Sequence, residues 1–126
     1  MVDKRTEHIE QRELVQWVRQ MTPLLVIAIP NGGKRGKLEA IRLRAEGVTA
    51  GVPDLHIPRF ALWIEMKAKG GRLSPVQKEM HERLRSEGQT VVTCFSTEEA
   101  INVVTARMED VGMVPTRQPI RKMVKT

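Results

Sequence analysis

Hydrophobic residues recur with two different periods along this chain, and prolines and glycines separate the segments. From Thr6 to Met21 the apolar residues recur every three or four positions, which predicts an amphipathic helix with Thr6 as its N-cap. Pro23 ends that helix. The apolar, partly β-branched run from Leu24 to Ile29 then predicts a short buried strand, closed by the turn sequence Pro30 to Gly33.

A second helix is predicted from Lys37 to Glu46, with Gly47 where a C-cap glycine belongs. One face of this helix is apolar, with Leu38, Ile41 and Ala45, and the basic residues Arg42 and Arg44 lie away from it. Two strand-like runs follow, from Asp54 to Ile57 and from Leu62 to Lys67. The connection between them is short, which makes them antiparallel partners in a hairpin.

The remaining pattern predicts two more helices with a strand between them. The segment from Ser74 to Gly88 begins with a serine N-cap and a proline at the first helical position, and its inward residues are Val76, Met80 and Leu84. Thr90 to Phe95 forms the fourth strand. A capping box from Ser96 to Glu99 opens the last helix, which Gly112 closes.

These elements predict an α/β fold in which helices flank a mixed four-stranded sheet. Residues 1–112 make one domain, as expected for a chain of 126 residues. Residues 113–126 contain two prolines, four basic residues and no acid, so we expect an extended, basic C-terminal tail.

Composition favours a polyanionic partner. The 21 Lys and Arg outnumber the 15 Asp and Glu, which gives a net charge of +6. Aromatic residues make up only 3% of the chain, so contact with a phosphate backbone is favoured over stacking of single-stranded bases. No apolar run is long enough to cross a bilayer, the first residues are charged, and Cys94 has no second cysteine to pair with. We therefore expect a cytoplasmic protein without a membrane partner.

The candidate chemistry lies on the predicted hairpin. Side chains alternate along a strand, so Glu65 and Lys67 share a face, and hairpin pairing brings Asp54 beside Glu65. Two carboxylates and the Met66 backbone carbonyl are a typical protein contribution to an octahedral Mg²⁺ site. Lys67 is placed to orient a water or to stabilise charge that develops on a phosphate.

On the spacing of Glu65 and Lys67 alone, a salt-bridge ladder on a hairpin surface is the favoured explanation. The surrounding strand, however, is apolar and expected to be buried: Leu62, Trp63, Ile64 and Met66. Charges in such a strand are costly unless they pair or bind a metal, which favours the metal site.

The motif Gly51-Val52-Pro53-Asp54, ten residues and then Glu65-Met66-Lys67 resembles that of the PD-(D/E)XK nucleases, whose core runs α-β-β-β-α-β. The VRR-NUC branch is the most similar, in the sequences Pro30 to Gly33, Gly47, Gly51 to Asp54, and Ser74-Pro75 with Gln77. The likeness extends from Thr6 to Glu99. It implies a Mg²⁺-dependent nuclease, with Mn²⁺ able to substitute, in a bacterium or a phage-infected cell.

The resemblance also implies two further site residues. A glutamate of the first helix joins the metal site in this family, and Glu10 is preferred here, with Glu7 as the alternative on the same helical face. Gln77 is implied as an active-site residue. On spacing alone, a buried amide that bonds to a loop backbone explains Gln77 equally well. His56 shares a strand face with Asp54, although a half-buried strand histidine is the commoner explanation.

Basic and turn residues beside this site predict a DNA contact surface. These residues can expose backbone amides and positive side chains to phosphates, and they are Asn31, Gly33, Lys34, Arg35, Lys37 and Arg42. A plain Asn-Gly turn explains the start of this segment as well.

The leading hypothesis is a metal-dependent DNA endonuclease that acts as a homodimer on branched DNA such as four-way (Holliday) junctions. The resemblance to stand-alone VRR-NUC proteins implies the junction preference, and two-fold symmetry would supply the second cut. The alternatives are a non-catalytic, basic nucleic-acid-binding module and a structural subunit that docks through its tail. The nuclease is favoured because a binding module gains nothing from buried acids that face a polyanion.

Overall fold

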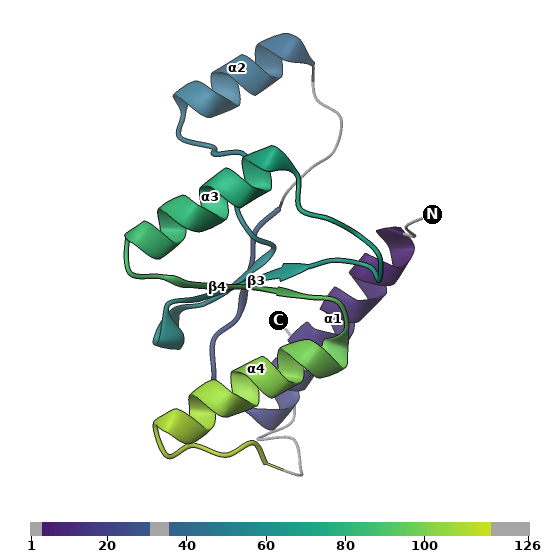
Figure 1. Cartoon of the computed structure of the whole chain (residues 1–126), viewed down its shortest axis with the longest axis vertical. Helices are drawn as coiled ribbons and strands as arrows, with labels where there is room; N and C mark the ends of the chain where they lie inside the picture. The colour runs from purple at the N-terminus through teal and green to yellow at the C-terminus, as the bar shows by residue number, and fades with distance from the viewer. Residues whose placement is uncertain (1–3, 31–35, 117–126) are drawn as a thin grey trace.

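The computed structural model of the chain describes residues 4–30 and 36–116 (Figure 1). In chain order its elements are α1 (Lys4–Met21), β1 (Ile27–Ala28), α2 (Lys37–Ala45), β2 (Leu55–Ile57), the 3₁₀ turn η1 (Pro58–Phe60), β3 (Leu62–Met66), α3 (Pro75–Ser86), β4 (Thr90–Cys94) and α4 (Thr97–Asp110).

The four strands form one mixed sheet in the order β1-β2-β3-β4. β1 pairs with β2 and β2 with β3 in antiparallel fashion, whereas β3 and β4 are parallel. A parallel pair needs a crossover connection, and α3 provides it. The predicted α/β class, the mixed four-stranded sheet and the antiparallel hairpin are therefore confirmed.

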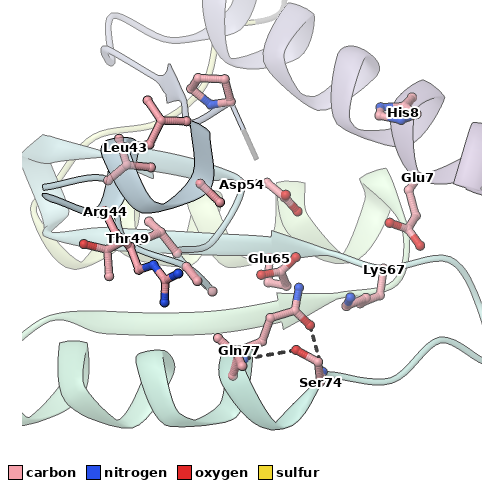
Figure 2. A pocket seen from close by; sticks show the side chains of 17 residues that line it. Glu7, His8, Leu43, Arg44, Thr49, Asp54, Glu65, Lys67, Ser74 and Gln77 are labelled. Carbon is pink, nitrogen blue, oxygen red and sulfur yellow. Dashed lines mark hydrogen bonds between the residues drawn. The ribbon is translucent and has the colours of Figure 1, made fainter. Parts of the chain in front are cut away.

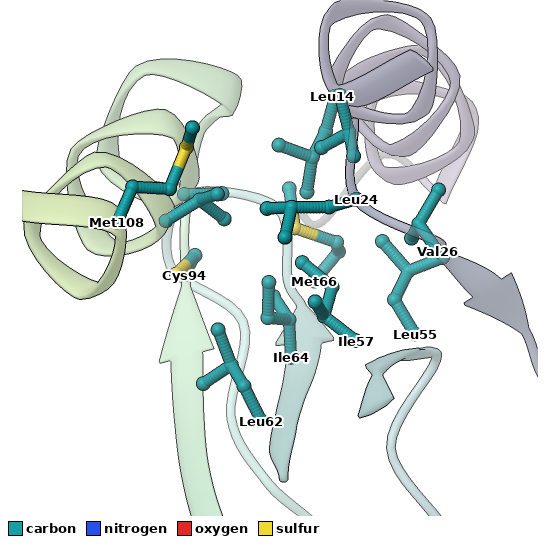
Figure 3. Packing of buried hydrophobic residues seen from close by; sticks show 13 residues of the cluster. Leu14, Leu24, Val26, Leu55, Ile57, Leu62, Ile64, Met66, Cys94 and Met108 are labelled. Carbon is teal, nitrogen blue, oxygen red and sulfur yellow. The ribbon is translucent and has the colours of Figure 1, made fainter. Parts of the chain in front are cut away.

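The hydrophobic core lies on one face of the sheet. The side chains of Leu62, Ile64 and Met66 on β3 are at most 1% exposed, and they face the helices α1 and α4 (Figure 3). Leu14 packs from α1 and Met108 from α4. The alternate residues of β3 face the opposite side of the sheet, which α3 covers (Figure 1). Hydrophobic burial by α1 and α4 thus leaves the α3 face available for polar groups.

The predicted buried strand from Leu24 to Ile29 is wrong in extent and in burial. Only Ile27 and Ala28 pair with β2, and both are exposed. Leu24 and Val26 reach the core, but 63% of Leu25 is exposed. The strand is exposed because β1 lies at the edge of the sheet and the hydrophobic core covers only one face of that sheet.

The second helix forms where it was predicted, but its apolar face is not buried. No residue of α2 is buried, and Leu38 and Ile41 are 83% and 49% exposed. In Figure 1, α2 stands beyond the sheet, next to the start of α3. The following loop is held close to α3 at Gly51, where a Cβ atom would lie 2.6 Å from the Val76 carbonyl oxygen.

The inner face of α3 also differs from the prediction. Val76 is 51% exposed, and the buried residue of this helix is His81. Gln77, Met80 and Leu84 are partly buried beside it, so the inner face is rotated by about one residue from the predicted stripe.

The described part of the C-terminal segment bonds to the end of α1. The Thr116 amide donates to the Met21 carbonyl at 3.0 Å. The remainder of the predicted tail, residues 117–126, lies outside the described residues. Among the helices described, none is long and apolar enough to cross a membrane.

Candidate active site

A pocket of about 780 Å³ opens beside the α3 face of the sheet (Figure 2). One end is charged and polar, lined by Glu7, Asp54, Glu65, Lys67 and Gln77. The other end lies against α2 and the loop after it, and its lining includes Leu43, Arg44, Val48 and Thr49. A second hollow of about 460 Å³ shares Asp54 and continues along α1 and β1.

The hairpin register brings the two carboxylates together. Leu55 pairs with Ile64, so Asp54, one residue earlier, lies opposite Glu65, one residue later. The Met66 amide donates a hydrogen bond of 2.8 Å to Oδ2 of Asp54 across the hairpin. The backbone of β3 therefore fixes the Asp54 carboxylate beside Glu65.

Glu65 is the strongly perturbed acid of this site. Glu65 is only 3% exposed. Burial, followed by the charge of Asp54 and a hydrogen bond with it, raises the pKa of Glu65 to about 9, although Lys67 acts in the opposite direction. In the absence of a cation Glu65 is therefore protonated at neutral pH, and the proton relieves the repulsion between the two acids.

The donor chemistry fits a hard divalent cation. A cation between Asp54 and Glu65 would remove the repulsion that otherwise keeps Glu65 protonated. Within residues 4–30 and 36–116, no group of three His, Cys, Asp or Glu side chains forms a closed metal site. Two carboxylates with the Met66 carbonyl and waters make an open site, which suits Mg²⁺ because Mg²⁺ keeps several of its waters.

Comparison with known proteins agrees with this geometry. No protein-family model matches the chain, and no curated protein does. A solved structure described as a VRR_NUC domain protein is 27% identical, with a TM-score of 0.71, over 86% of this chain and 92% of that one. This likeness over most of both chains supports the predicted resemblance to VRR-NUC proteins. The fold that positions the two carboxylates is thus the nuclease-like fold of VRR-NUC proteins.

The two candidate glutamates of the first helix occupy different places in the structure. Glu7 lines the pocket, and its charge contributes to the raised pKa of Glu65. Glu10 lies outside the pocket, where its Oε2 atom accepts hydrogen bonds from the Thr97 amide at 3.0 Å and the Thr97 hydroxyl at 2.8 Å. The geometry therefore favours Glu7 over the preferred Glu10, because the start of α4 engages the Glu10 carboxylate.

Gln77 combines the two roles that its spacing left open. The side-chain Oε1 atom of Gln77 accepts a hydrogen bond from the Ser74 backbone amide at 2.9 Å. The backbone amide of Gln77 donates to the Ser74 hydroxyl at 3.2 Å, so the two residues form a capping box. The same side chain lines the pocket, and Figure 2 shows its amide nitrogen turned toward Glu65. Capping of α3 thereby orients the Gln77 amide.

Other predicted site residues lie elsewhere. The ring of His56 stacks on Trp63 at 4.0 Å, and its Nδ1 contacts the Leu62 carbonyl, as expected of an ordinary strand histidine. Lys37 and Arg42 are exposed on α2, where Arg42 pairs with Glu46 at 3.2 Å. The predicted DNA contacts before α2 lie outside the described residues: Asn31, Gly33, Lys34 and Arg35.

Sequence reasoning missed His81 and gave little weight to Arg44. His81 is 1% exposed, and its Nε2 lies 3.4 Å from Oε1 of Glu65. The available signal was its position four residues after Gln77, which places both on one helical face. Arg44 lines the pocket from α2.

The shifted pKa predicts how pH acts on the metal-free protein. The folded state holds a proton on Glu65 up to about pH 9, whereas the unfolded chain releases it near its ordinary value of 4.5. The folded state binds more protons between these values, so its free energy of unfolding falls as pH rises from about 5 to 9. Glu65→Gln, which cannot ionise, should remove this contribution.

Urea denaturation in EDTA at pH 5, 7 and 9 measures this effect. We expect Glu65→Gln to become progressively more stable than the wild type as pH rises. Glu79→Gln, on the exposed side of α3, is the matched control and should follow the wild type. Parallel pH profiles for the wild type and Glu65→Gln would contradict the assignment.

The contrast between Glu7 and Glu10 gives a paired prediction. Glu10→Ala removes the acceptor of two hydrogen bonds from Thr97 and should cost about 1–3 kcal/mol of stability, with Mn²⁺ affinity retained. Glu7→Ala should leave stability near that of the wild type and weaken Mn²⁺ binding about tenfold or more. Urea denaturation and calorimetric Mn²⁺ titration measure the two effects. The reverse pattern would restore Glu10 as the helix ligand.

Proposed function

We propose that this chain is a Mg²⁺-dependent endonuclease that hydrolyses phosphodiester bonds in DNA. The observation that carries the proposal is the Asp54–Glu65 pair, with the Met66 amide bonded to Asp54 and Lys67 beside it in an open pocket. The likeness to a VRR_NUC domain protein suggests a nuclease independently of that geometry.

Each residue of the pocket has a role in this mechanism. Asp54, Glu65 and the Met66 carbonyl would hold Mg²⁺, and Glu7 faces the same site from α1. Bound there, Mg²⁺ would withdraw charge from the scissile phosphate and favour deprotonation of the attacking water. Glu65 would hold the cation in its ionised form, and its proton would pass to solvent. The Lys67 ammonium donates to a phosphate oxygen, where it stabilises the negative charge of the transition state.

Groove shape and charge support DNA as the substrate. The pocket and the adjoining hollow make a track that passes Asp54 and continues along α1 and β1. Arg44 lines the far end of the pocket, where a guanidinium suits the next phosphate of a strand. The chain's net charge of +6 adds a favourable long-range attraction.

We further propose a symmetric homodimer that prefers four-way junctions. One chain supplies one cleavage site, so two cuts across a junction need a second copy. Unpartnered apolar residues support self-association: Leu38 and Ile41 on α2, and Leu25 and Ile27 at the edge strand.

Three isosteric substitutions test catalysis. Asp54→Asn, Glu65→Gln and Lys67→Met should each lower Mg²⁺-dependent nicking of supercoiled plasmid by about a hundredfold or more, since each removes a charge from the reacting groups. The variants should remain folded. In EDTA, Asp54→Asn should bind DNA as tightly as the wild type or more tightly, because it loses negative charge. Glu65→Gln should bind DNA like the wild type, since Glu65 is already protonated without a cation.

Glu79→Gln serves as the control for these assays and should nick like the wild type. Substantial nicking by Asp54→Asn or Glu65→Gln would defeat the assignment. A wild-type chain that binds DNA but never cuts it, in Mg²⁺ or Mn²⁺, would establish the non-catalytic binding module instead.

The dimer is tested by charged substitutions on α2. Leu38→Glu combined with Ile41→Glu should convert a dimer to a monomer in sedimentation experiments and remove the preference for junctions over linear duplex. The control is Val114→Glu, because Val114 is 72% exposed but lies after α4. A wild-type monomer at micromolar concentration would refute the dimer and leave the nuclease proposal intact.

A further inference from the structure

His81 lies directly against the Glu65 carboxylate, from the side of α3. The Nε2 atom of His81 is 3.4 Å from Oε1 of Glu65, and the two side chains are 1% and 4% exposed. Asp54 lies opposite Glu65 across the β2–β3 hairpin. Glu65 is therefore held between an acid of the hairpin and an imidazole of the covering helix.

The position of the imidazole proton follows from the surroundings of its two nitrogens. Nδ1 is buried and has no hydrogen-bond partner among the residues described. A proton on Nδ1 would bury an unsatisfied donor and leave Nε2 without a hydrogen to offer the Glu65 oxygen. A proton on Nε2 satisfies both Nε2 and Oε1.

A purely structural role does not account for this residue. His81 is the buried residue of α3, at a position where a leucine or phenylalanine would fill space without an unpaired nitrogen. An unsatisfied buried polar atom costs about 1–3 kcal/mol. Gln77, one helical turn earlier, also faces the site. Two polar side chains of α3 therefore lie next to the Glu65 carboxylate.

We propose that His81 is a positioning residue, whose Nε2–H donates to Oε1 of Glu65 and holds that carboxylate turned toward Asp54. The role rests on the proposed function, because Asp54 and Glu65 are the acids that would bind the cation. Partners that orient metal-binding carboxylates typically change metal affinity about 10–100-fold when they are lost.

Two substitutions separate positioning from packing. His81→Phe fills the site without a donor, whereas His81→Gln retains an N–H near the position of Nε2. In EDTA we expect the stability of His81→Phe to stay near that of the wild type, because removal of the unpaired Nδ1 offsets the loss of the hydrogen bond to Glu65. Its Mn²⁺ affinity, measured by calorimetry, should fall about 10–100-fold, and His81→Gln should recover most of that loss. Met80→Leu, at the neighbouring partly buried position, should leave the affinity unchanged.

Unchanged Mn²⁺ affinity in His81→Phe, or no recovery in His81→Gln, would overturn the positioning role. A wild-type chain that binds no Mn²⁺ would overturn the proposed function and this role with it. If the phenylalanine variant does not fold, ¹⁵N NMR of the wild-type imidazole at neutral pH decides the question. The proton is expected on Nε2, and a proton on Nδ1 would refute the role.

Discussion

Two acids held side by side on a buried sheet face are the constraint on which the rest of this structure depends. The register of the β2–β3 hairpin fixes their proximity, and the Met66 amide anchors Asp54 in place. Glu65 is almost fully buried, so its ionised form is unfavourable unless a cation is bound, and the protonated form is favoured otherwise. Lys67, Glu7 and the polar residues of α3 gather around this unfavourable arrangement, as they would around a functional site.

Stability and chemistry are divided between the two faces of the sheet. The face toward α1 and α4 carries the apolar side chains of β2 and β3, and this one-sided core stabilises the fold (Figure 3). The opposite face has no need to be uniformly apolar, so α3 can bury a histidine and direct an amide toward the pocket. The division explains how a small domain accommodates buried acids that by themselves destabilise it.

The helix α2 has a separate part in this arrangement. It buries no residue of its own, yet Leu43 and Arg44 form one wall of the pocket. Close approach of Gly51 to the start of α3 keeps the connecting loop against that wall. The nuclease-like core is shared with the VRR_NUC domain protein that it resembles, whereas α2 and edge strand β1 present the exposed apolar surface on which association would depend.

The amino-acid sequence determined the features that follow from local periodicity. Alternation within β3 separated the core residues from Glu65 and Lys67, and the serine and proline before α3 marked its first turn. The short connection after β2 implied the hairpin, and hence the proximity of Asp54 to Glu65. These features need only neighbours along the chain or across one tight connection, so pattern and stereochemistry are enough to predict them.

Tertiary structure decided what depends on distant segments. Glu7 and Glu10 share a helical face, but Glu10 lies outside the pocket, where Thr97 at the start of α4 binds its carboxylate. The exposed face of α2 and the exposed side of β1 result from their positions at the periphery of the sheet. His81 became a site residue because the crossover places α3 over β3. A helical or strand period specifies which residues share a face, but only packing against the remainder of the chain determines what that face contacts.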